Sequence, residues 1–405
     1  MTHPVAVKFL DRTTPPHVST LIVLAGVSAA VMNMFLPSLP NMAAHFGVPY
    51  SLMQLSVPLY LGFSAILQTI IGPLSDKFGR RKVTLWGVGL FVAFSFGCII
   101  APNVEVFLFC RMGQASVAVG MVLSRAAIRD MFDQNQAASM IGYVTMGMAL
   151  VPMISPMIGG VLDQWFGWQS VFWGFLILGM ITFVMAYRDM GETAAGSDKS
   201  VIEQFRQYPE LLRSPRFWGY ALAASFCSGA FFSYLGGAPF IGSEIFGMSP
   251  AVLGLYFGAP AVGYALGNYA TGRFAERLGI NRLILIGCIV NAAGVALSLS
   301  VFLLGLGSPV TFFGFMSLVG IGNGLVIPNA TAGLLSVRPL IAGAASGLGG
   351  AIMIGGGALL SALAGSLLTL ETGAYPLLYI QLATGLAAIA SICLVLLRER
   401  QIGIA

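Results

Sequence analysis

The chain has 405 residues, of which 57% are hydrophobic and 9% are charged, and its mean hydropathy is +0.87. A soluble domain is about a quarter charged, so this composition excludes a water-soluble globular protein and indicates one that the lipid bilayer surrounds. The net charge of +5 allows an acidic partner, but cations that orient a membrane protein explain it better, and we expect no nucleic-acid partner.

Twelve apolar runs are each long enough, at about 20 residues, to cross a bilayer. They lie near 18–42, 50–73, 83–102, 104–128, 137–161, 166–187, 216–240, 250–271, 282–305, 309–334, 341–369 and 374–397. The predicted fold is therefore an all-α membrane protein with twelve transmembrane helices. Six helices form an N-terminal bundle over 1–187, six form a C-terminal bundle over 216–405, and a polar loop at 188–215 joins the two bundles.

The charges between the spans predict their direction. The two tails and the even-numbered connections hold 18 of the 20 Lys and Arg residues. The charges at the odd-numbered connections are all acidic and comprise Glu105, Asp163, Glu244 and Glu371. Because Lys and Arg concentrate in cytoplasmic loops, we expect a multi-pass protein of the bacterial inner membrane with both termini in the cytoplasm.

One charged stretch recurs 200 positions along the chain. Residues 72–81 read GPLSDKFGRR, and residues 272–282 read GRFAERLGINR. We expect Gly72 to permit close approach of a neighbouring helix and Asp76 to pair with Arg80, whereas the second copy has Ile280 and Asn281 in place of the two arginines and should hold less firmly. The predicted gating residues are Gly72, Asp76, Gly79, Arg80, Arg81, Glu276 and Arg277.

The fourth span contains Arg111, about 10 Å inside the hydrocarbon at 1.5 Å per residue. A buried arginine costs several kcal/mol unless a partner or water compensates it. Gln114 lies on the same helix face and completes a candidate site for substrate or proton. The alternative is an arginine that extends to the membrane surface.

The fifth span is rich in proline and glycine. Two prolines on one face remove backbone donors and bend the helix, and glycines permit close packing. The residues concerned are Gly147, Pro152, Pro156, Gly159 and Gly160.

These motifs together resemble a known family. The stretch 72–81 resembles the loop 2–3 signature of the major facilitator superfamily, and the fifth span resembles its antiporter signature. Matches at 36–40, 234–240 and 322–329 resemble the bicyclomycin/chloramphenicol-resistance (Bcr/CflA) type of drug:proton antiporter. The resemblance covers nearly the whole chain. It implies two bundles that alternate access to a midplane site, and contact of Asp76 with the eleventh span when the site opens outward.

The first span departs from that family. Relatives usually read Asp-Met-Tyr-Leu-Pro, whereas this chain reads Asn33-Met-Phe-Leu-Pro. No Asp or Glu stands in the middle of any span, and none of the three histidines lies inside one. Three possibilities remain: a carboxylate at the end of a span carries the proton, protons move only through water and substrate, or transport is not coupled to protons. Arg111 is left without a charged partner, which favours anionic substrates.

Polar and aromatic residues near the middle of the membrane are candidates for lining a substrate cavity. The candidates besides Arg111 and Gln114 are Asn33, Phe35, Tyr60, Tyr143, Tyr234, Tyr256, Asn268, Asn323 and Asn329. The sequence shows no metal-ligand cluster, no nucleotide-binding loop and no nucleophile beside a base, so we expect neither a cofactor nor an enzyme.

The leading hypothesis is a monomeric secondary transporter that exports small amphipathic compounds in exchange for protons. The runner-up is an exporter or uncoupled facilitator of an organic anion, such as a siderophore or a carboxylate, held by Arg111. A minor alternative is a membrane sensor that transports nothing, which the short cytoplasmic loops make less attractive.

Overall fold

The computed structural model describes residues 7–132, 154–193, 208–338 and 342–401, with the single residues 140, 144 and 151. Eleven helices or continuous helical runs in this part of the chain are long and apolar enough to cross a membrane. The predicted fifth span falls largely outside the described residues, which show a helix over 154–166. The all-α membrane architecture predicted from the sequence is confirmed.

Proline and glycine divide several spans into shorter elements. Those of the first half are α1 (Val18–Asn33), η1 (Leu36–Ser38), α2 (Leu39–Phe46), α3 (Tyr50–Gln54), α4 (Ser56–Phe78), α5 (Arg80–Ile99), α6 (Val104–Gly113), η2 (Gln114–Val117), α7 (Ala118–Met131) and α9 (Gln169–Asp189). Those of the second half are α11 (Tyr208–Leu212), α12 (Pro215–Phe240), η3 (Ile241–Ile245), α13 (Pro250–Phe257), α14 (Ala259–Leu278), α15 (Ile280–Leu303), α16 (Pro309–Val337), α17 (Ala342–Leu367) and α18 (Tyr375–Gln401).

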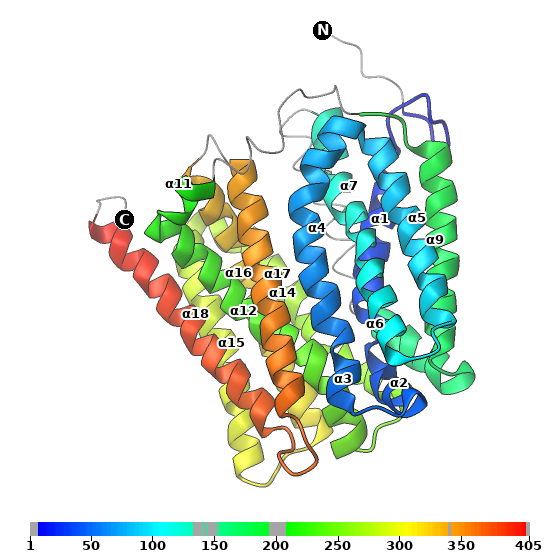
Figure 1. Ribbon diagram of the computed structural model, residues 1–405. Coiled ribbons are helices and arrows are strands. Elements are labelled where there is room, and N and C mark those ends of the chain that lie inside the picture. The colour runs from blue at the N-terminus through cyan, green and yellow to red at the C-terminus, as the bar shows by residue number, and fades with distance from the viewer. Residues whose placement is uncertain are drawn as a thin grey trace.

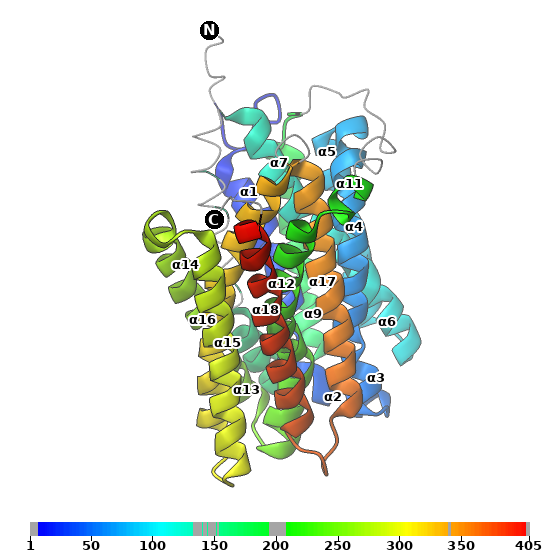
Figure 2. The same ribbon diagram turned by 90° about the vertical axis from the view of Figure 1, so that its left-hand side faces the viewer.

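The helices of the two halves lie next to each other, with α4 and α17 side by side at the boundary (Figure 1). Figure 2 shows the second half in front, with α15, α18 and α17 in order from left to right. The start of α1 and the end of α18 lie on one side of the molecule, at the top of Figure 1. We call this the termini side and the opposite one the far side.

The two halves are joined on the far side. The hydroxyl of Tyr50 donates to the carbonyl of Gly236 at 2.8 Å, and the amide of Gln54 donates to the carbonyl of Ser361 at 2.8 Å. Described residues on the termini side show no hydrogen bond between halves. A Cβ atom built at Gly72 would meet no described atom within 4 Å, so no described residue packs against α4 at that point.

The recurring glycines of the two charged stretches have a backbone role. Gly79 has φ +94° and Gly279 has φ +78°, values that residues with a Cβ rarely adopt. Each glycine is the single residue between two membrane helices. The helices before them extend to Phe78 and Leu278, past the predicted ends at 73 and 271, because polar residues at the membrane surface continue the helix in water.

Candidate functional site

Arg111 lies opposite a break in the first span. Pro37 has no backbone N–H and its ring would collide with the carbonyl of Asn33, four residues earlier, so α1 ends at Asn33. The last bond of the α1 ladder runs from the Met34 N–H to the Ala30 carbonyl. The carbonyl of Val31 is next in line and instead accepts a hydrogen bond from Nη2 of Arg111 at 2.8 Å.

The guanidinium of Arg111 is fully buried and is held mainly by neutral groups. Its carbon lies 4.0 Å from the ring centre of Phe35 and 4.3 Å from that of Tyr60. Nη1 donates to Oε1 of Gln114 at 2.7 Å, and Gln114 in turn donates to Ser95 at 2.9 Å. Cation–π contacts of a desolvated arginine contribute about 2 kcal/mol, and the negative end of the α1 dipole adds to this stabilisation.

The structure decides between the two interpretations of Arg111. Its side chain is 0% exposed, so the alternative in which it extends to the membrane surface is wrong. No carboxylate in the described part of the chain contacts it. The Nε atom of Arg111 is buried and lacks a partner among the described residues, which leaves one donor for a ligand.

The side chain of Asn33, another predicted site residue, forms its hydrogen bond within α1. Its amide donates to the carbonyl of Ala29, one turn back on α1, at 2.8 Å, and its side chain is buried. Ser95 and the carbonyl of Val31 complete the surroundings of Arg111, and the sequence analysis missed both. The proline at 37 was the available signal, since it predicts a free carbonyl before the helix break.

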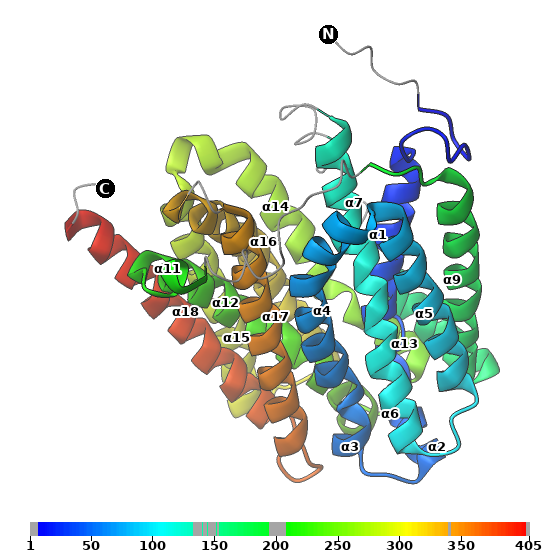
Figure 3. The same ribbon diagram turned by 45° about the horizontal axis from the view of Figure 1, so that its top comes forward.

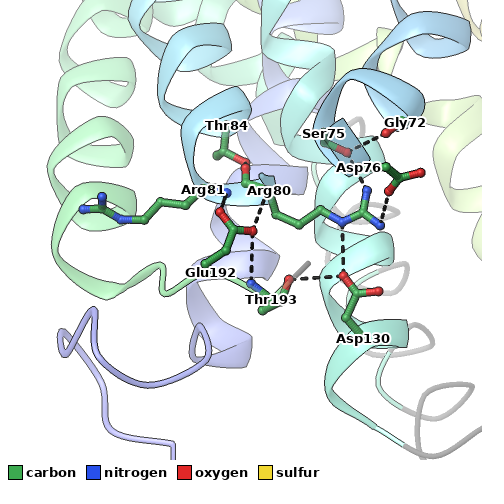
Figure 4. A network of polar contacts seen from close by, with 9 residues as sticks. All are labelled: Gly72, Ser75, Asp76, Arg80, Arg81, Thr84, Asp130, Glu192 and Thr193. Carbon is green, nitrogen blue, oxygen red and sulfur yellow. Dashed lines mark hydrogen bonds and ion pairs between the residues drawn. The ribbon is translucent and has the colours of Figure 1, made fainter. Parts of the chain in front are cut away.

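The first charged stretch forms a polar network on the termini side (Figure 4). Arg80 pairs with Asp76 at 2.7 Å, as expected, and also with Asp130 of α7 at 3.1 Å and with the Ser75 hydroxyl. Arg80 is 8% exposed. The network therefore joins α4, α5 and α7 within the first half. Its contact with the eleventh span stays a prediction, because the side chains of 339–344 lie outside the described residues.

A third carboxylate, that of Glu192, completes this network from beyond the end of α9. Glu192 accepts hydrogen bonds from the backbone N–H groups of Arg80 at 2.7 Å and Arg81 at 3.3 Å, at the N-terminus of α5 where negative charge is favoured (Figure 4). Arg81 reaches the carbonyl of Tyr187 at 2.8 Å. Sequence reasoning named the basic residues but missed Asp130 and Glu192, whose proximity depends on helix packing.

The second copy has its own polar cluster in place of the missing arginines. Glu399 of α18 is 5% exposed and pairs with Arg216 of α12 at 2.6 Å. It also accepts hydrogen bonds from the Tyr220 hydroxyl at 3.0 Å and from the amide of Asn281. Glu276 and Arg277, by contrast, are exposed, and the described residues show no ion pair for either. The polar cluster of the second half is therefore centred on Glu399, and the gating role of Glu276 stays a prediction.

Replacing Glu399 by glutamine should lower the free energy of unfolding by about 3 kcal/mol, because it leaves the half-buried Arg216 without its counter-charge. The measurement is thermal unfolding in detergent. Glu210→Gln is the matched control, since its ion pair with Arg338, at 2.7 Å, is more than half exposed and should contribute less than about 1 kcal/mol. Equal effects in the two variants would contradict a structural role for Glu399.

The helix at 154–166 contacts both halves on the far side. A Cβ atom at Gly159 would collide with the carbonyl oxygen of Met34, and one at Gly160 would collide with that of Pro250 at the start of α13. A Cβ atom at Gly254 of α13 would likewise collide with the carbonyl oxygen of Pro156. Two further members of the predicted antiporter helix, Gly147 and Pro152, lie outside the described residues.

The remaining polar candidates lie in the second half, away from Arg111. Asn268 donates to the Tyr264 carbonyl at 2.8 Å, and Asn329 donates to Thr271 at 3.2 Å. These groups lie where α14 and α16 pack closely, side by side in Figure 3. Asn323 is buried on α16, and Tyr234 is fully buried against Phe257. The structure therefore brings together Arg111 and Gln114, and a substrate-binding role for these four residues stays a prediction.

Comparisons with known proteins agree with this architecture. The family model described as Major Facilitator Superfamily matches residues 21–349. The chain is 30% identical over 378 residues to an uncharacterized MFS-type transporter, YdgK, of Bacillus subtilis, with 92% of each chain covered. It is 31% identical to a chloramphenicol resistance protein of Pseudomonas aeruginosa, over 77% of this chain and 74% of that one.

A further relative and a solved structure extend the comparison. A bicyclomycin resistance protein homolog of Haemophilus influenzae is 26% identical over 91% of this chain and 93% of its own. A bacterial homolog of the human lysosomal transporter Spinster, in an inward-facing and occupied conformation, superposes with a TM-score of 0.74 at 17% identity, over 95% and 96% of the two chains. The structural likeness concerns the fold alone.

Proposed function

The chain belongs to the Major Facilitator Superfamily, and from this premise we propose that it exports small amphipathic compounds by alternating access, in exchange for protons. The observation that carries the proposal is the buried arginine site, in which Nε of Arg111 has no partner among the described residues and two aromatic rings flank the guanidinium. The names of the relatives from Pseudomonas aeruginosa and Haemophilus influenzae support resistance-type export.

The proposed cycle uses two closures on opposite sides of the membrane. The far side is held shut by Tyr50, Gln54 and the glycine contacts of helix 154–166, which supports a state open toward the termini. We propose that the termini side is cytoplasmic in the bacterial inner membrane, that the bundles 1–187 and 216–405 move as two bodies, and that the transporter acts as a monomer.

Proton exchange is tested by substrate-stimulated proton release from proteoliposomes. Adding a transported drug should release protons to the side from which the drug is taken, and collapsing the pH gradient should slow drug movement at least about tenfold. An unchanged rate of drug movement without a gradient would contradict the exchange and leave a facilitator.

A second candidate is export of an organic anion, such as a siderophore or a carboxylate. Two arginines inside the spans favour it. Arg111 contacts no described carboxylate, and Arg125 of α7 is exposed. Guanidinium groups that face a cavity bind carboxylates in bidentate fashion. Uptake of anionic against cationic fluorescent substrates into inverted vesicles distinguishes the two candidates.

A further inference from the structure

One acidic side chain is buried on the far side of the molecule. Asp163 lies near the end of the helix at 154–166 and is 4% exposed. It is one turn beyond Gly159, on the same helix face, and Gly159 touches the backbone of Met34 at the break in the first span. Nδ2 of Asn41 donates to Oδ2 of Asp163 at 2.9 Å. The hydroxyl of Ser38 is buried without a hydrogen-bond partner among the described residues, and it lowers the pKa of the same carboxylate.

Asp163 differs from the other buried carboxylates of the described residues, which are Asp189 and Glu399. Asp189 accepts two backbone hydrogen bonds, from Leu10 at 2.6 Å and from His17 at 2.9 Å, and Glu399 is paired with an arginine. Those bonds stabilise the charged forms. Asp163 has only the neutral side chains of Asn41 and Ser38, so burial penalises its charge without an opposing cation.

No described cation on this side of the molecule offsets the charge of Asp163. His45 of α2, Glu105 of α6 and Glu244 of η3 are exposed, and Tyr50 of α3 bonds to the second half. Burial raises the pKa of Asp163 above its ordinary value of 3.8, and the neighbouring side chains of Ser38 and Asn41 only partly oppose this shift. No charged residue contributes to that shift of the pKa.

The burial of Asp163 depends on contact between the two halves. Element η1, which carries Ser38, packs against α12 and α13 of the second half. Gly160, three residues before Asp163, touches the backbone of Pro250 in α13. If the halves separate on this side, as alternating access requires, water reaches Asp163 and the penalty on its charge falls.

We propose that Asp163 is the proton-binding group of the outer gate. Its carboxylate takes a proton from outside water as the far side closes, with Ser38 available to accept the resulting O–H hydrogen bond, and returns the proton when that side opens. No other bond forms or breaks. The proposal rests on the alternating access of the proposed function and identifies a peripheral carboxylate in a chain whose first span has Asn33 in place of an acid.

The sign of the pH effect follows from this linkage. A group whose pKa is higher in the closed state binds its proton more tightly there, so lowering the pH favours closure. The effect operates between the ordinary value of 3.8 and the raised pKa of the closed state. A proton held at Asp163 therefore shifts the equilibrium toward the inward-open form.

The test measures the opening of the far side directly. Spin labels are placed at Ile100→Cys and Leu304→Cys, exposed positions at the far-side ends of α5 and α15, in a Cys393→Ser background because the other native cysteines are buried. Double electron–electron resonance then gives the closed population at each pH. The parent should close as the pH falls. Asp163→Asn should stay closed at every pH, and an unchanged pH response in this variant would overturn the proposal.

Two further variants keep the test decisive even if Asp163→Asn folds poorly. Asn41→Leu removes the hydrogen bond that lowers the pKa of Asp163, so its transition should move to higher pH, and an unmoved or lower midpoint would overturn the proposal. Glu105→Gln and His45→Gln remove exposed groups of the same side and should leave the midpoint unchanged. A lost response in either control would assign the proton to that residue.

This readout needs neither substrate nor a proton gradient. The pH response of the gate could be lost in Asp163→Asn while drug movement does not depend on the pH gradient. That result would support the role of Asp163 and contradict the proposed proton exchange. Drug movement driven by the pH gradient, with an unchanged pH response of the gate in Asp163→Asn, would support the proposed exchange and contradict the role of Asp163. The two failures are therefore distinguishable.

Discussion

Replacement of Arg111 by alanine should reduce transport at least about a hundredfold, while the folded protein persists. The change removes the only described cation that contacts Phe35, Tyr60 and Gln114 together, and with it the free donor at Nε. A lost charge-assisted hydrogen bond of about 3 kcal/mol corresponds to roughly a hundredfold in affinity. The measurement is drug uptake into inverted membrane vesicles.

Two other variants separate a functional role from packing. Arg111→Lys keeps the charge but loses the planar fork, so we expect it to retain a small fraction of the activity. Arg188→Ala removes an exposed arginine at the end of α9 and should transport like the parent. An Arg111→Ala protein with normal uptake would show that the arginine is a structural element of the first half and that the substrate binds elsewhere.

The arginine site illustrates what the sequence could predict. The depth of Arg111 in an apolar run, the position of Gln114 one turn on and the proline at 37 are local patterns, and each follows from helix geometry. The ring positions of Phe35 and Tyr60 also suited the midplane of their spans. What the pattern could not supply was the side on which α1 and α4 approach α6, since packing of three helices has no local signal.

The predicted gating residues also show that the sequence does not reveal contacts between helices far apart in the chain. The repeat places a glycine at 79 and again at 279, and both residues have the positive φ that favours glycine. The partners of Arg80, Asp130 and Glu192, lie 50 and 112 positions further along the chain. Glu276 matches Asp76 in sequence yet is exposed, and Asn281 of the second copy bonds to Glu399 of α18 instead.

Replacement of Gly160 by alanine should stall the transporter with its far side open. The added methyl group would collide with the carbonyl of Pro250 and come within about 3 Å of the Cα atom of Ala251. Backbone atoms cannot rotate away as a side chain can, so closure would need to move α13. Overpacking of this kind costs about 1–3 kcal/mol, which would shift the equilibrium between the two states roughly 5- to 150-fold.

Resonance distances between labels at 100 and 304 should lengthen in Gly160→Ala, and uptake should fall by a similar factor. Gly347→Ala is the matched control, because a Cβ atom there meets no described atom within 4 Å and alanine favours the helix.

Gly72→Leu supplies the opposite case, since no described atom lies within 4 Å of a Cβ at Gly72 in this state and we expect crowding when the termini side closes. The two glycine variants should therefore block transport with opposite changes in the distance. Lengthening in both, or in neither, would contradict a gate built from helix contacts on opposite sides of the membrane.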